Sequence, residues 1–139
     1  MTTTRTPDDL FAEFQRGVLG DGLPLTEDML AEDVVVEMPF LPAGMPRRIE
    51  GRDAYLAFSE AADAGHVVRF TEFRDVVVHR TADPEVIIAE YELAGTRTDT
   101  GATGSSGFVI VLRARDGRIA HWREYQNVPA MGDLMGGLG

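Results

Sequence analysis

The sequence predicts an α+β fold in which helices pack against a mostly antiparallel sheet. Three segments in the N-terminal half have amphipathic helical patterns, and four strand-like segments follow them. Helices followed by a meander of strands are typical of an α+β fold with an antiparallel sheet. A length of 139 residues suits one domain with its own core, and no repeat or linker divides it, so residues 1–139 are expected to form a single domain.

Capping residues mark the expected helices. The first helix is expected between Thr6, as its N-cap, and Gly20, because a proline follows the cap and an apolar stripe follows the proline. Thr26 can cap a short second helix. A third helix is expected to follow Gly51 and to end near Gly65.

The remaining elements are expected to be strands and loops. Residues 34–38 have strand chemistry and run into a proline-rich loop. Glycine and small polar residues at 98–107 indicate a mobile hairpin loop. The glycine-rich tail after Pro129 either frays or folds its apolar residues over a pocket. The four strands after the third helix are expected at residues 67–79, 85–97, 108–114 and 118–128. The first of them is expected to bend near residues 74–75.

Composition excludes several classes of function. The net charge of −10 argues against binding nucleic acid or an anionic membrane surface. The absence of Cys and Lys excludes disulfides, thiolate chemistry and Schiff bases. The three His residues are far apart and no nucleotide-binding motif occurs, so neither a metal nor a cofactor is expected. No signal peptide or apolar span is evident, and we expect a cytoplasmic protein.

Glu124 is the most informative residue, because it is a carboxylate within a hydrophobic strand that follows a predicted Asp-Gly turn. Strand side chains alternate, so Trp122 and Glu124 share one face, while His121 and Arg123 share the other. If the Trp122 face points inward, desolvation raises the pKa of Glu124 and suits it to acid–base chemistry. The alternative is that Glu124 pairs with a buried Arg or faces solvent.

Three segments resemble the SnoaL-like branch of the nuclear-transport-factor-two-like, or ketosteroid-isomerase-like, superfamily. These segments are residues 30–40, 49–55 and 116–127, within a similarity that covers roughly residues 7–131. The sequence Trp-Arg-Glu-Tyr at 122–125 is similar to Trp-Arg-Asp-Tyr of limonene-epoxide-hydrolase-like proteins. The sequence Arg-Glu-Tyr-Gln-Asn at 123–127 is similar to the matching strand of phenazine-biosynthesis A/B proteins. In both groups the acidic residue is a catalytic acid or base, which the resemblance assigns here to Glu124.

The resemblance further implies a curved sheet wrapped around helices, a conical pocket and a homodimer. The dimer is expected to form through the outer face of the sheet, where Val109, Val111 and Tyr125 point outward. Departures from the better-known sites are equally informative. Met38 stands where ketosteroid isomerases place an Asp base, and Tyr91 and Leu93 stand where epoxide hydrolases place an Arg-x-Asp pair. Neither of those two sites is therefore complete.

Two hypotheses about function remain open. The first is a cofactor-independent cyclase, isomerase or dehydratase for a small hydrophobic or aromatic molecule, with Glu124 as acid–base and Tyr91 as hydrogen-bond donor. The second is a non-catalytic binding or assembly module of the same fold. Glu90 and Glu92 are expected to point away from the pocket, and Met38 rather than Glu37 to point inward. The expected pocket residues are Phe14, Met38, Phe40, Tyr55, Phe58, Leu93, Phe108 and Trp122.

Overall fold

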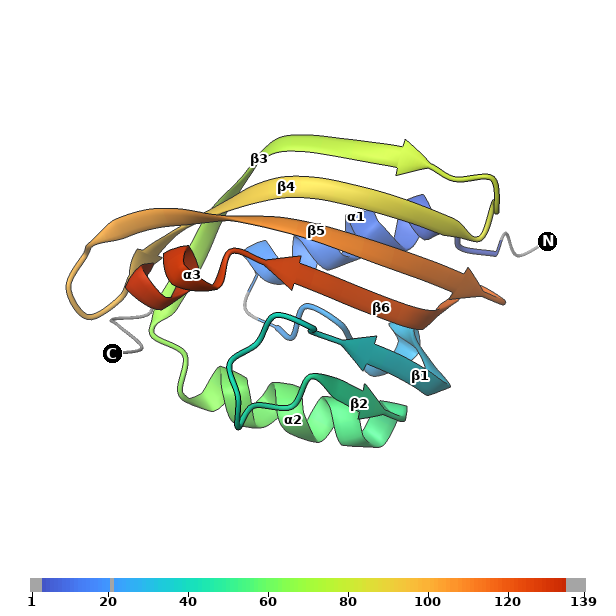
Figure 1. Ribbon diagram of the computed structural model, residues 1–139, viewed down its shortest axis with the longest axis horizontal. Coiled ribbons are helices and arrows are strands. Elements are labelled where there is room, and N and C mark those ends of the chain that lie inside the picture. Colours follow the sequence, from blue (N-terminus) through green and yellow to red (C-terminus); the bar gives the residue numbers. More distant parts are fainter. Residues whose placement is uncertain (1–3, 21, 135–139) are drawn as a thin grey trace.

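The computed structural model describes residues 4–20 and 22–134 and consists of helices against one six-stranded sheet (Figure 1). The strand order is β2-β1-β6-β5-β4-β3. The sheet is mixed, because β1 pairs with β6 in parallel while every other pair is antiparallel. The elements are α1 (Pro7–Leu19), a 3₁₀ turn (Glu27–Met29), β1 (Leu30–Glu37), β2 (Arg48–Glu50), α2 (Arg52–Ala64), β3 (Val68–Arg80), β4 (Val86–Arg97), β5 (Thr103–Arg115), β6 (Arg118–Gln126) and α3 (Val128–Leu134).

The predicted α+β class with a curved, mostly antiparallel sheet is confirmed. The long strands β3, β4 and β5 bend together over α1 (Figure 1). Register shifts interrupt the β3–β4 pairing between Arg74 and Val77, where Asp75 has a φ of 53°. An irregularity of this kind bends a strand and increases its twist, and it lies where the sequence predicts a bend.

Helix α1 packs into the concave face of the sheet. Thr6 and Asp9 form a capping box, in which each side chain accepts a hydrogen bond from the other residue's backbone N–H. Leu10, Phe11 and Phe14 then lie on one buried stripe. Burial of this stripe, rather than helix propensity alone, holds the helix against the strands.

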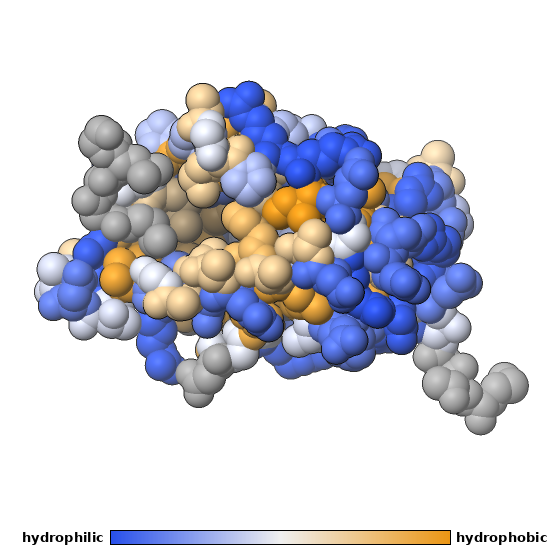
Figure 2. Space-filling view, turned by 90° about the horizontal axis from the view of Figure 1, so that it is seen from below, coloured by the Kyte–Doolittle hydropathy of each residue, from blue (hydrophilic) through white to orange (hydrophobic). Residues whose placement is uncertain are grey.

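Helix α2 lies beside β1 and β2, at one edge of the sheet, and α3 lies across the ends of β4 and β5 (Figure 1). Tyr55, Leu56 and Phe58 of α2 are half-buried against the core. In Figure 2, which shows the molecule from below, hydrophobic residues gather in the middle of the face and the surface is hollowed beside them. No helix within the described residues combines the length and the apolar character needed to cross a membrane.

Several elements differ from the sequence-based expectation. The helix predicted after Thr26 is a single 3₁₀ turn, and β1 begins directly after it at Leu30. Strand β2 and helix α3 were not predicted, so the third α-helix is C-terminal. The apolar residues of the tail do cover the interior as far as Leu134, which is 4% exposed; residues 135–139 lie outside the described part.

The segment predicted as a mobile loop, 98–107, is half strand. Strand β5 begins at Thr103, and Ser105 and Ser106 pair with Ala94 and Leu93 of β4. Ser106 is 1% exposed, and its hydroxyl donates to the Asn127 carbonyl at 3.2 Å. Pairing with a long neighbouring strand therefore overrides the weak strand propensity of glycine and serine.

Candidate functional site

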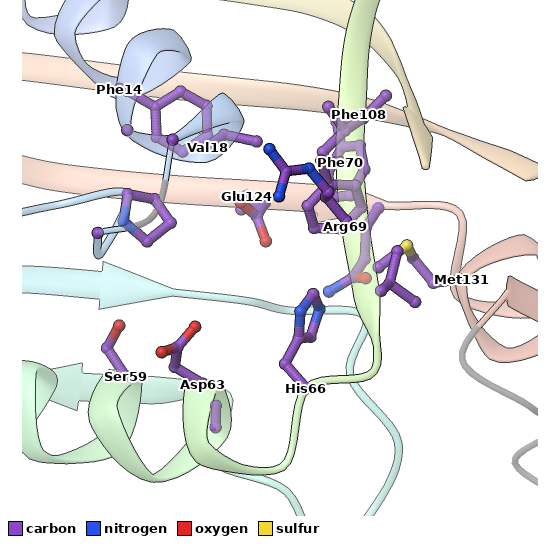
Figure 3. Close-up of a pocket in the computed structure, with 18 of the residues that line it drawn as sticks. Phe14, Val18, Ser59, Asp63, His66, Arg69, Phe70, Phe108, Glu124 and Met131 are labelled. Carbon is purple, nitrogen blue, oxygen red and sulfur yellow. The ribbon is translucent and has the colours of Figure 1, made fainter. Parts of the chain in front are cut away.

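Strand β6 places Glu124 in a cavity of about 470 Å³ inside the curved sheet. The register pairs Glu124 with Ile110 of β5, which is fully buried, so Glu124 faces inward as its parity with Trp122 predicts. The ends of α1 and α2, the start of β3 and helix α3 surround the cavity (Figure 3). The lining residues are Phe14, Gly17, Val18, Gly20, Gly22, Pro24, Ser59, Ala62, Asp63, His66, Val68, Arg69, Phe70, Tyr91, Leu93, Thr98, Phe108, Glu124, Gln126 and Met131.

The environment of Glu124 favours the protonated form of its carboxyl group. Burial raises the pKa of Glu124 to about 7, from an ordinary value of 4.5. The indole N–H of Trp122 acts in the opposite direction and is the weaker effect. No cationic side chain lowers this pKa. The carboxyl can therefore both give and take a proton near pH 7.

Aromatic rings fix Tyr91 within the same cavity. Its ring stacks on Phe108, with centroids 5.3 Å apart, and contacts Phe73 with centroids 5.0 Å apart. Burial first, and then the negative charge of Glu124, raise the pKa of the Tyr91 hydroxyl well above its usual value. The hydroxyl consequently stays protonated and remains a hydrogen-bond donor beside Glu124.

Helix α2 supplies two more hydroxyl groups. Burial, followed by the charge of Glu124, raises the pKa of Tyr55 to about 12, while contact with the Ser59 hydroxyl acts in the opposite direction. Ser59 lines the cavity and points toward the side where Glu124 lies (Figure 3). The sequence interpretation missed Ser59, although its spacing of four residues from Tyr55 puts both on one face of a helix.

The structure divides the predicted pocket residues into three groups. Phe14, Leu93 and Phe108 line the cavity. Met38, Tyr55, Phe58 and Trp122 do not line it but belong to the apolar core or pack against it. Trp122 packs against Phe14 at a tilt, with ring centroids 4.7 Å apart, and thereby supports the cavity wall.

Phe40 is the exception and corrects the prediction. It is 62% exposed and packs on Tyr125, with ring centroids 5.2 Å apart, on the outer face of the sheet. The chain turns after β1, where the Leu41 amide donates to the Met38 carbonyl, so the inward alternation ends at Met38.

The mouth of the cavity is polar. Asp63, Arg69 and Thr98 line it and are exposed, whereas His66 is half-buried with its ring 5.4 Å from that of Phe70. His66 follows Gly65, the C-cap of α2, and its imidazole lies beside Phe70 of β3. Within residues 4–20 and 22–134, no cluster of three His, Asp or Glu side chains is arranged to hold a metal ion.

The other carboxylates named in the sequence interpretation lie outside the cavity. Glu37 accepts a hydrogen bond from His121 at 2.5 Å and lies 3.4 Å from Arg123. The His121 hydrogen bond is the largest effect that holds the pKa of Glu37 below its usual value, and Arg123 adds to it. Glu90 contacts His79, and Glu92 accepts from Ser105. All three face outward, as predicted.

Comparison with known proteins finds relatives that match most of the chain. An uncharacterised PhzA/B-like protein of Pseudomonas aeruginosa is 33% identical over 111 residues, which are 80% of this chain and 77% of that protein. A crystal structure of a putative isomerase from Bacillus subtilis is 28% identical with a TM-score of 0.74 and coverage of 95% of this chain and 96% of that chain. A putative polyketide cyclase from Pseudomonas putida has a TM-score of 0.72 at 21% identity, with coverage of 94% and 98%.

The sequence pattern of one protein family matches most of the chain. Residues 9–122 match the SnoaL-like domain, and a structural neighbour is described as having a ketosteroid isomerase-like fold. The resemblance inferred from the three sequence segments is thereby confirmed. The match begins within α1 and ends at Trp122 in β6, just before Glu124, and it includes β1 to β5. The chain belongs to the SnoaL-like domain family.

Proposed function

We propose that the protein is a cofactor-independent enzyme that cyclises, isomerises or dehydrates a small hydrophobic molecule. Glu124 transfers the proton, and the Tyr91 hydroxyl stabilises an oxygen that gains negative charge. Ser59 adds a hydroxyl to the cavity from helix α2, and the buried Tyr55 hydroxyl lies beside it. The observation that carries the proposal is a carboxyl group with a pKa of about 7, without a cationic partner, at the base of a cavity.

The names of the relatives support this choice of reaction class. Many isomerisations and cyclisations require a proton to move at carbon next to a carbonyl group, and one well-placed acid–base group serves that chemistry. The cavity volume suits a molecule of two or three fused rings. Aromatic and aliphatic walls exclude water from the carbon that reacts, which strengthens the effect of the buried carboxyl.

Exchange of carbon-bound hydrogen tests this proposal without knowledge of the natural substrate. The bicyclic ketone 2-tetralone has acidic C–H bonds beside its carbonyl, and we expect the protein to accelerate their exchange for deuterium in D₂O, measured by NMR. Glu124→Gln keeps the shape but cannot accept a proton, so the rate should fall by about 10²–10⁴-fold. The wild-type rate should rise with pH through about 7, because the ionised carboxylate is the base.

The matched control is Glu37→Gln, which changes a carboxylate of the outer face. It should leave the exchange rate within about twofold of the wild type, since surface changes rarely alter a remote site. Equal exchange by the wild type and Glu124→Gln would show that Glu124 is not the base. Binding of 2-tetralone without exchange by the wild type would support the non-catalytic binding module instead.

The outer face of the sheet supports a second part of the proposal, a homodimer. Phe40 and Tyr125 form a partly exposed aromatic pair beside Val109, in a shallow trough of the outer face. Exposed aromatic residues that are contiguous with other apolar side chains are typical of interfaces. A second copy of this chain placed on the trough would cover them.

Light scattering at micromolar concentration is therefore expected to give twice the mass of the chain. Phe40→Glu should shift the mass toward the monomer, because it puts a charge into the interface core. Met45 lies in the same loop and is 44% exposed. The control variant Met45→Glu should leave the dimer intact. A monomer mass for the wild-type protein would contradict the dimer while leaving the acid–base site untouched.

A further inference from the structure

Arg69 stands out among the residues at the mouth of the cavity. It is the second residue of β3 and pairs with Thr96 of β4. The neighbouring backbone is fixed, because the Thr98 amide donates to the Val67 carbonyl at 2.8 Å. Figure 3 shows the guanidinium group of Arg69 reaching from β3 into the cavity, toward the side on which Glu124 lies.

The guanidinium group has no ionic partner within the described part of the chain. Of the 13 arginines, eight form salt bridges with carboxylates. Arg69 is the one arginine that lines this cavity, among residues 4–20 and 22–134. An arginine at a cavity mouth that has no carboxylate partner among residues 4–20 and 22–134 is available for an anionic ligand.

Arg69 and Glu124 act at different places in the cavity. Arg69 reaches the cavity from β3 and Glu124 from β6, and within residues 4–20 and 22–134 no salt bridge joins the two side chains. Phe14, Phe70 and Phe108 also line the cavity, with Phe14 on one side of Glu124 and Phe70 and Phe108 on the side of β3 (Figure 3). An aromatic ring system can lie along these side chains, and one end of it then reaches Arg69 while the other reaches Glu124.

We propose that the cavity recognises an aromatic carboxylic acid, whose carboxylate binds the Arg69 guanidinium while its ring system extends toward Glu124. This substrate class builds on the proposed acid–base function and identifies Arg69 as a residue that determines specificity. Arg69 can offer two parallel N–H groups to the two carboxylate oxygens, which is the geometry a guanidinium favours.

A carboxylate fits the mouth better than a phosphate does. Asp63 lines the same mouth and the whole protein has a charge of −10, so a doubly charged group meets more repulsion than a singly charged one. One guanidinium group balances one negative charge. His66, whose imidazole also lines the mouth, packs at a tilt against Phe70 and can donate a further hydrogen bond.

Three naphthalene probes of nearly equal size test the proposal by isothermal titration calorimetry at pH 7.5. 2-Naphthoate is expected to bind the wild-type protein about tenfold more tightly than the neutral 2-naphthamide, since a charge-assisted pair replaces a neutral hydrogen bond. 2-Naphthyl phosphate is expected to bind more weakly than 2-naphthoate. Arg69→Gln should remove the preference for the acid while changing the amide affinity by less than about twofold.

Matched variants separate recognition from general electrostatics. Arg118→Gln removes the same charge from an exposed arginine on the β5–β6 hairpin, outside the cavity lining, and should preserve the preference. Asp63→Asn removes the repulsive carboxylate at the mouth and should increase the preference for 2-naphthoate. Arg69→Lys should keep part of the preference for 2-naphthoate that Arg69→Gln loses. Arg69 is exposed, so thermal unfolding should show that all these variants fold.

Several results would overturn the proposal: equal affinity of the wild type for acid and amide, equal weakening of both by Arg69→Gln, tighter binding of the phosphate, or no binding of any probe at millimolar concentration. The outcome is independent of the catalytic test. If Glu124→Gln retains hydrogen exchange but Arg69→Gln loses acid preference, the acid–base function fails and the carboxylate site stands.

Discussion

Glu124→Gln is expected to stabilise the protein at alkaline pH, by about 3 kcal/mol above pH 8. The pKa of Glu124 is about 7 in the folded protein and 4.5 as the ordinary value. Each unit of difference corresponds to about 1.4 kcal/mol. The folded state therefore keeps a proton that the unfolded state releases, so the wild type loses stability as the pH rises from about 4.5 to 7. Glutamine has the same shape and no charge to bury.

Urea unfolding of both proteins at pH 5, 6, 7 and 8 measures this difference. The advantage of Glu124→Gln should be smallest at pH 5 and should level off above the folded pKa. Glu37→Gln is the control with the opposite sign, because the folded protein lowers the pKa of Glu37. Its stabilising contribution is present above the ordinary pKa, so Glu37→Gln should destabilise the protein at pH 8. A gain for Glu124→Gln that does not change with pH would contradict the buried, uncompensated carboxyl.

Phe14→Ala is expected to cost about 3–5 kcal/mol of unfolding free energy. Phe14 is 6% exposed and its ring contacts Trp122, Phe73 and Tyr91, with centroids 4.7, 6.1 and 6.3 Å away. Truncation removes these contacts and leaves a larger void, because the strands behind cannot collapse onto the helix.

Thermal and urea unfolding should report this loss. Leu19→Ala, at the exposed end of the same helix, should change stability by less than about 1 kcal/mol. Tyr91 depends on the same cluster for its position, so Phe14→Ala should also lower the rate of hydrogen exchange in the protein that remains folded. A cost below about 1 kcal/mol would show that α1 tolerates a hole at this place.

Most of what could be predicted about the site from the sequence follows from the alternation of side chains between the two faces of a strand. The parity of Trp122 and Glu124 places the carboxyl on the inner face, and the same rule places Glu37, Glu90 and Glu92 outside. The same rule predicts that the side chain of Tyr91 lies on the inner face of its strand. These predictions succeed because each depends on the geometry of one strand.

The features that the sequence did not predict depend on contacts between distant segments. Phe40 follows the end of β1, so alternation no longer fixes its direction, and a tertiary contact with Tyr125 does. Gly104 and the residues after it become strand because β4 is already there to pair with them. Arg69 and Ser59 meet at one cavity because α2 and β3 converge on it. No local pattern in a single sequence encodes such a meeting.

The parallel pairing of β1 with β6 also determines when the site can exist during synthesis. Leu30 lies beside Ile119 and Val36 beside Trp122, so the centre of the sheet joins the start of the chain to nearly its end. A growing chain that lacks β6 leaves β1 and β5 as open edges, which invite pairing with other chains. Closing so long a loop is slow. The strand that carries Glu124 is therefore both the last of the six strands to be synthesised and the one that closes the sheet. Chains without it have no cavity to bind a ligand and two edges that favour aggregation.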